Sequence, residues 1–77
     1  MKERLELLIE KNRDKLKFIE NEITSLNMKY MEILDEDENN IHLKKIETEI
    51  NYLERQQDSI VRSLMDKKRQ LRELNSN

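Results

Sequence analysis

Glycine, proline, cysteine and tryptophan are all absent from this sequence of 77 residues. Without cysteine the chain can form neither a disulfide bond nor a thiolate metal site, and its single histidine, His42, cannot hold a metal ion alone. Without glycine and proline it lacks the residues that most often break helices and form turns. β-Branched and aromatic residues are too sparse to build a β-sheet. These absences favour long helices.

Catalytic motifs are missing as well. The sequence has no Ser-His-Asp set, no glycine-rich phosphate loop and no pair of histidines at metal-binding spacing. It also has no run of about 18 apolar residues that could span a membrane, and residues 1–9 are too charged for a signal peptide. We therefore expect a soluble, intracellular (cytoplasmic) protein that is not an enzyme and that binds no cofactor, metal ion, small molecule or membrane.

The residues that are present repeat in a regular way. Charged residues make up 42% of the chain and hydrophobic residues 35%, a balance that also occurs in disordered proteins. In two stretches, however, apolar residues recur at alternating spacings of three and four, which is the repeat of a coiled coil. The predicted helix–helix seam consists of Leu5, Ile9, Asn12, Leu16, Ile19, Ile23, Leu26, Tyr30 and Ile33 in the first stretch and of Leu43, Ile46, Ile50, Leu53, Gln57, Ile60, Leu64, Lys67, Leu71 and Leu74 in the second.

The two stretches do not share one register, because the second begins one residue earlier than a continuation of the first requires. The mismatch falls in residues 35–40, which are all polar. Acidic side chains there are repelled by the negative C-terminal end of the first helix and attracted by the positive N-terminal end of the second. Asp37, Asn39 or Asn40 can cap the start of that second helix. The alternative is one continuous helix of over about 100 Å with a local stammer. We predict instead an all-α antiparallel coiled-coil hairpin, a single unit over 1–77, with helices at about 2–35 and 41–74 and a turn at about 36–40.

The hairpin also predicts which residues face each other. In an antiparallel pair the residue numbers of facing positions have a constant sum, which here is 76, as for Ile33 with Leu43 and Leu26 with Ile50. This pairing puts a seam residue opposite a seam residue along both arms. It also places the fold point inside the acidic run, which the repeat alone does not require.

Polar residues interrupt the seam at Asn12, Gln57 and Lys67. Either they fix the register, as a buried Asn can in a coiled coil, or they reach water at little cost from a narrow seam. Tyr30, near the turn, is expected to be a seam residue with its hydroxyl in water. His42 is expected to be a solvated residue at the start of the second helix.

Apolar residues also lie beside the seam. A lone hairpin covers only one stripe of each helix, so apolar flanks indicate a second layer. That layer is either a second copy, which makes a four-helix bundle, or a helix of another protein. The candidate partner surface consists of Leu8, Phe18 and Tyr52 on one side and of Met31, Leu34, Val61 and Met65 on the other.

Charge is distributed unevenly along the hairpin. Residues 18–59 hold four Lys/Arg and eleven acids, a net charge of −7. Residues 1–17 hold six Lys/Arg and four acids, and residues 60–77 hold five and two, so the open end carries +5. The candidate phosphate contacts in this basic region are Lys67, Lys68, Arg69 and Arg72.

Together these features predict a non-enzymatic helical interaction module. We expect an adaptor, scaffold or small regulator that acts through coiled-coil protein–protein contacts, either with itself as a homodimer or with a helix of a partner protein. The alternative is a nucleic-acid-associated accessory factor that uses the basic open end. No residue pattern in the chain identifies the biological process.

Overall fold

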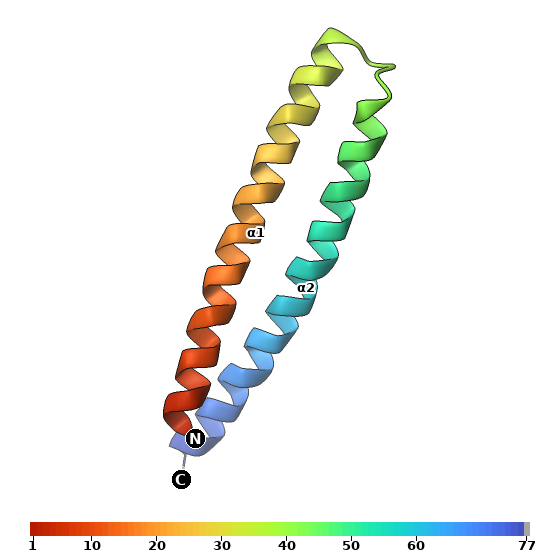
Figure 1. The fold of residues 1–77 in the computed structure, drawn as a ribbon. Coiled ribbons are helices and arrows are strands. Elements are labelled where there is room, and N and C mark those ends of the chain that lie inside the picture. The colour runs from red at the N-terminus through yellow and green to blue at the C-terminus, as the bar shows by residue number, and fades with distance from the viewer. Residues whose placement is uncertain (77) are drawn as a thin grey trace.

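The computed structural model of the chain describes residues 1–76 and consists of two long helices that run antiparallel (Figure 1). Helix α1 spans Lys2–Glu36 and helix α2 spans His42–Asn75, and the described residues contain no strand. The helices pack against each other along their length, and both chain ends lie at the same end of the hairpin (Figure 1). The predicted all-α helical hairpin is confirmed, and each helix bound lies within one residue of its expected position.

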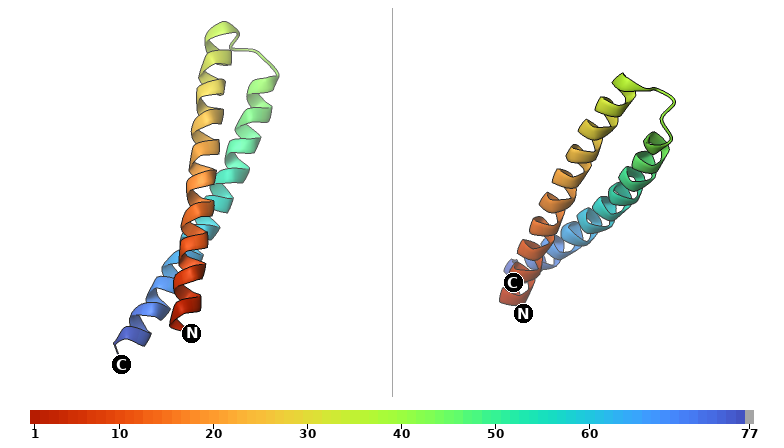
Figure 2. Two further views of the ribbon diagram at one scale, coloured as in Figure 1. Left: turned by 60° about the vertical axis from the view of Figure 1, so that its left-hand side comes forward. Right: turned by 45° about the horizontal axis from the view of Figure 1, so that its top comes forward.

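The hairpin is long, narrow and slightly wound. Its Cα atoms extend over 59 × 14 × 14 Å. The helix axes are inclined, and in the left view of Figure 2 α2 passes behind α1 toward the open end. This inclination suits the apolar repeat. In a straight helix of 3.6 residues per turn, a seven-residue repeat drifts sideways by about 20° per heptad. Inclined axes keep the two apolar stripes in contact.

Predicted seam residues form the core. The buried side chains are those of Ile9, Ile19, Leu43, Ile46 and Leu64. All other predicted seam residues are half-buried, except one. No large side chain in the described part of the chain is completely enclosed, because each helix is covered along a single stripe.

Leu74 is the exception, since its side chain is 40% exposed. The expectation that it belongs to a covered seam is wrong for a geometric reason. In the antiparallel pairing, residue 74 lies level with the first residue of α1, Lys2. No further turn of α1 extends over Leu74, so water reaches it from the open end.

The turn needs no glycine, because no residue of 1–76 has a positive φ angle. Asp37 leaves α1 in an extended conformation, with φ −155° and ψ 101°. Its carboxylate accepts a hydrogen bond from the backbone N–H of Asn39 at 3.0 Å. The side-chain oxygen of Asn40 accepts one from the backbone N–H of His42 at 2.9 Å. Ile41, between them, already has helical angles of φ −63° and ψ −24°.

Asn40 therefore performs the capping of α2. It satisfies a backbone N–H in the first turn of that helix, where such groups have no partner within the helix. Asn40 is one of three capping candidates named by the sequence. Asp37 shapes the turn instead, and Asn39 is held by it.

Candidate interaction surface

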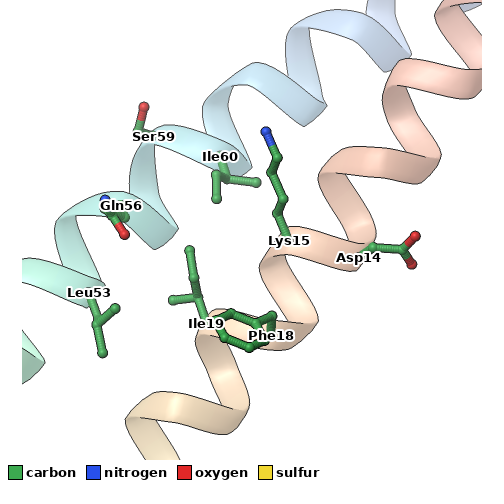
Figure 3. Close-up of a pocket in the computed structure, with 8 residues that line it drawn as sticks. All are labelled: Asp14, Lys15, Phe18, Ile19, Leu53, Gln56, Ser59 and Ile60. Carbon is green, nitrogen blue, oxygen red and sulfur yellow. The ribbon is translucent and has the colours of Figure 1, made fainter.

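A groove lies between the two helices near the middle of the hairpin (Figure 3). Its volume is about 650 Å³. In Figure 3 the side chains of Ile19, Leu53 and Ile60 point into the space between the helices. The residues that line the groove are Asp14, Lys15, Phe18, Ile19, Leu53, Gln56, Ser59 and Ile60. The groove floor is thus part of the seam, and its rim is formed by flanking residues.

Phe18 dominates the rim. It belongs to α1, it borders the groove, and its side chain is 65% exposed. Lys15, one turn earlier, extends toward α2, whereas the carboxylate of Asp14 points away from the groove (Figure 3). On α2 the rim is made by Gln56 and Ser59. Because serine is short, the apolar floor beneath it stays accessible.

The other predicted partner-surface residues divide into two groups. Met31, Tyr52 and Met65 are exposed as expected. Leu8, Leu34 and Val61 are half-buried, because they lie directly beside the seam and the hairpin itself covers part of them. The exposed apolar residues are thus Phe18 and Tyr52 on one flank of the hairpin and Met31 and Met65 on the other.

Three exposed apolar residues were missed by the sequence reading. They are Leu7, Met28 and Ile41. Leu7 and Met28 lie on the side of α1 that faces away from α2, and Ile41 lies in the turn. No seam or flank pattern identifies such positions, and single exposed apolar residues are common on protein surfaces.

A polar cluster joins the helices near the open end. The Asn12 side-chain amide donates a hydrogen bond to the Ser63 hydroxyl oxygen across the hairpin at 3.4 Å. The Lys67 ammonium group donates to the same oxygen from the next turn of α2. The bond from Asn12 favours the first of the two expected roles for that residue, because it links the helices in one register. The contact of Lys67 lies within α2 and does not distinguish between the two roles. Gln57, the third interrupting residue, is half-buried in the seam.

Tyr30 makes the second side-chain bridge between the helices. Its hydroxyl donates a hydrogen bond to the Glu47 carboxylate at 2.8 Å. The pKa of Tyr30 is raised above its usual 10.0, first because of this hydrogen bond, then through loss of water contact and repulsion by the Glu47 charge. The hydroxyl lies at the exposed surface, as expected, and in addition bonds to Glu47 of the other helix. The residue numbers of the two bridges add to 75 and 77, on either side of the predicted 76.

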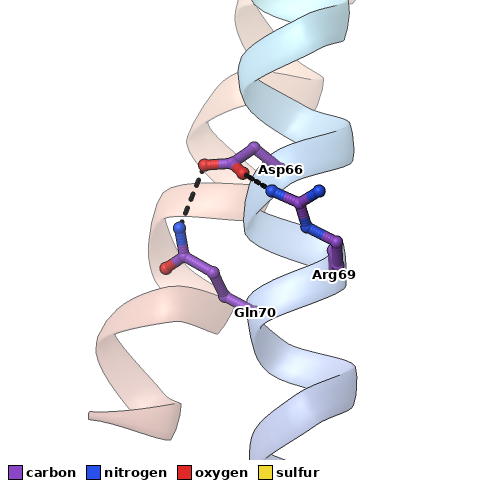
Figure 4. Close-up of polar contacts among 3 residues, drawn as sticks. All are labelled: Asp66, Arg69 and Gln70. Atoms are coloured by element: carbon purple, nitrogen blue, oxygen red, sulfur yellow. Dashed lines mark hydrogen bonds and ion pairs between the residues drawn. The ribbon is translucent and has the colours of Figure 1, made fainter.

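Two of the four candidate phosphate contacts are engaged within the chain. Arg69 forms an ion pair with Asp66 at 2.6 Å, and Gln70 donates a hydrogen bond to the other oxygen of the same carboxylate (Figure 4). Lys67 is half-buried and is directed at the Ser63 hydroxyl. Lys68 and Arg72 are exposed. The basic cluster is therefore only partly available to a phosphate group.

Within residues 1–76, no group of His, Asp and Glu side chains is arranged to hold a metal ion. Neither α1 nor α2 contains an apolar stretch long enough to cross a membrane. No protein-family model, curated protein or solved structure matches the chain. A function is therefore inferred from the groove and its rim.

Proposed function

We propose that this chain is a non-enzymatic interaction module that binds a helix in the groove beside Phe18. The observation that supports the proposal is the position of Phe18. Phe18 is 65% exposed and stands at the rim of an apolar groove, midway along the hairpin. The occupant is a helix of another protein or of a second copy.

The energetics of Phe18 favour an anchoring role. Aromatic side chains supply much of the binding energy in protein interfaces when they enter a desolvated pocket. Covering the exposed part of this ring contributes about 2 kcal/mol from apolar area alone. A helix laid along the groove would also cover the floor residues Leu53 and Ile60, which the hairpin leaves half-exposed.

The shape of the molecule suits a connecting or regulatory role. The long arms present a continuous face over 59 Å, and a groove between two helices accepts a third helix by ordinary side-chain packing. The uneven charge, −7 near the turn and +5 at the open end, orients a partner that carries the opposite pattern. An adaptor, a scaffold or a small regulator would use these properties.

A photo-crosslinking amino acid at Phe18 tests this proposal. The matched control places the same amino acid at Met31, which is exposed to a similar degree, 57% against 65%, but lies on the opposite flank of α1. In source cells we expect the Phe18 position to form protein adducts several-fold more often than the Met31 position. Equal or absent protein adducts would overturn the proposal.

The nucleic-acid alternative rests on the net charge of +5 at the open end and on the exposure of Lys68 and Arg72. Against it stands the engagement of Arg69 and Lys67 inside the chain. An electrophoretic retardation assay with random duplex DNA at low salt separates the two functions. The interaction module predicts no retardation. Retardation that Lys68→Glu and Arg72→Glu remove would favour the alternative.

A further inference from the structure

We infer that the partner in the groove is a second copy of this chain, packed face to face and antiparallel. The inference rests on the proposed function and names the occupant. In this dimer the Phe18 face, defined as the groove with its rim, meets the same face of the other copy. The acidic turn of each hairpin then lies beside the basic open end of its neighbour.

The size of the face favours nearly complete overlap of the two hairpins. A side of the hairpin measures 59 Å by 14 Å, or about 830 Å², and a stable interface buries about 800 Å² on each partner. A dimer shifted along its length would bury less of this face. Full overlap places the two-fold axis close to the middle of the hairpin.

The groove lies at that middle. Helix α1 spans Lys2–Glu36, so Ile19 is its central residue, and Phe18 is next to it. A two-fold axis through the groove therefore brings the two Phe18 rings together at the centre of a full-length overlap. Aromatic anchors are most effective at the centre of an interface, where surrounding contacts exclude water.

The net charge selects the antiparallel direction. A parallel dimer sets −7 beside −7 and +5 beside +5, whereas the antiparallel dimer sets each end beside its opposite. The arms extend over 59 Å, which is far longer than the Debye length of about 8 Å at physiological salt. Each end therefore responds mainly to the end packed beside it, and like charges in contact are penalised.

Individual residues agree with this direction. Lys15 and Glu22 are exposed, lie one heptad apart on the side of α1 that holds Phe18, and are equally far from the axis. Reversal of α1 about the axis therefore places Lys15 opposite Glu22 of the second copy. Arg4 and Glu32, each fourteen positions from Phe18, are related in the same way. A parallel dimer instead lays α1 against the other copy's α2, so Lys15 and Glu22 do not meet.

Sedimentation equilibrium on the purified chain tests the dimer and its face. The monomer has a mass of 9.5 kDa, and we expect a species of twice that mass over the micromolar to millimolar range. Phe18→Gln should raise the dimer Kd about tenfold or more, while Met31→Gln on the opposite flank should leave it unchanged. Both variants replace an exposed residue with a good helix former, and far-ultraviolet circular dichroism checks that each stays helical. A monomer at every concentration, or equal effects of the two variants, overturns the inference.

A charge-reversal cycle tests the direction. Lys15→Glu and Glu22→Lys should each raise Kd roughly two- to fivefold, and the double variant should return to the original Kd. The two residues are seven positions apart and make no direct pair within one helix, so recovery reports contact between copies. If the Kd of the double variant is raised by the two single effects combined, the antiparallel model is overturned.

The outcomes also separate this inference from the proposed function. If the purified chain stays monomeric while Phe18 crosslinks to a different protein in cells, the interaction module stands and the self-association falls. If the chain stays monomeric and Phe18 forms no protein adducts, both fall.

Discussion

The two halves of the hairpin are built differently. Near the turn, in residues 18–59, the seam is aliphatic apart from Tyr30 and Gln57, and the surface is acidic. In the open half, residues 1–17 and 60–76, Asn12 and Lys67 enter the seam, Ser63 joins them, and the surface is basic. The turn ties the helices together covalently at one end only. Within residues 1–76, each half has one side-chain hydrogen bond between the helices, Tyr30–Glu47 near the turn and Asn12–Ser63 in the open half, but only the open half has its bond where no turn holds the register.

The largest expected effect tests whether the halves differ in strength. Ile46, in the turn half, and Leu64, in the open half, are both buried in the seam. We expect Ile46→Ala and Leu64→Ala each to lower the free energy of unfolding by about 2–3 kcal/mol, the low end of the range for core truncation, because the seam is thin. Urea denaturation measures both losses.

The control for this pair is Glu20→Ala on the exposed surface of α1, which should change the free energy of unfolding by no more than about 0.5 kcal/mol. Similar losses in the free energy of unfolding at Ile46 and Leu64 would mean that apolar packing is equally strong in the two halves. The halves would then differ only in how they specify the register. A loss at Leu64 as small as that at Glu20 would instead show that the open half contributes little to the fold.

An intermediate effect is expected from removing the polar cluster. Ser63→Ala leaves Asn12 and Lys67 without their shared acceptor, which should cost about 1 kcal/mol. The loss should be local. A disulfide between cysteines placed at Leu26 and Ile50, in the turn half, should form equally fast with and without Ser63→Ala.

The matching pair in the open half is Leu5 and Leu71, whose numbers also add to 76. There Ser63→Ala should slow intramolecular disulfide formation and increase pairing between chains. Equal rates in both halves would contradict the view that the cluster holds the open end in register.

The smallest effect concerns the Tyr30–Glu47 bridge of the turn half. The pKa of Tyr30 is higher in the folded chain than its usual 10.0, mainly because of the hydrogen bond to Glu47. The bridge therefore contributes stability that is fully present below about pH 10 and is lost as the pH rises through the folded-state value. Tyr30→Phe should flatten this alkaline loss slightly.

Urea melts between about pH 8 and pH 11 compare the original chain, Tyr30→Phe and Glu47→Gln. Because every other titrating group is common to all three chains, their difference isolates the bridge. In both variants the free energy of unfolding should fall less steeply above about pH 10 than in the original chain. An equally steep fall in Tyr30→Phe would contradict the proposed role of the hydrogen bond.

The fold was predictable because its main determinants are periodic. The apolar repeat identifies which side of each helix is covered, and the register break near Asp37 locates the turn. Which residue caps α2 was not predictable, since Asp37, Asn39 and Asn40 all have suitable side chains. Backbone angles at Ile41 decide in favour of Asn40.

The candidate surface was predictable only in part. The repeat places Phe18 beside the seam, but the groove next to it depends on the small volume of Ser59 across the hairpin, which a repeat does not encode. The role of Ser63 was missed for a similar reason. Its position is an ordinary flank, and only the reach of Asn12 and the rotamer of Lys67 bring three polar groups together there.

The placement of both chain ends at the open end has a mechanical consequence (Figure 1). A force that pulls the two termini apart acts across the seam rather than along it, so the helices separate one layer after another. The resistance at any moment is that of a single layer, however many layers the hairpin contains. Layers that hold Asn12, Ser63 and Lys67 are among the first to carry the load, and the aliphatic layers near the turn carry it last. Tension on the termini thus separates the helices in a fixed order, from the open end toward the turn.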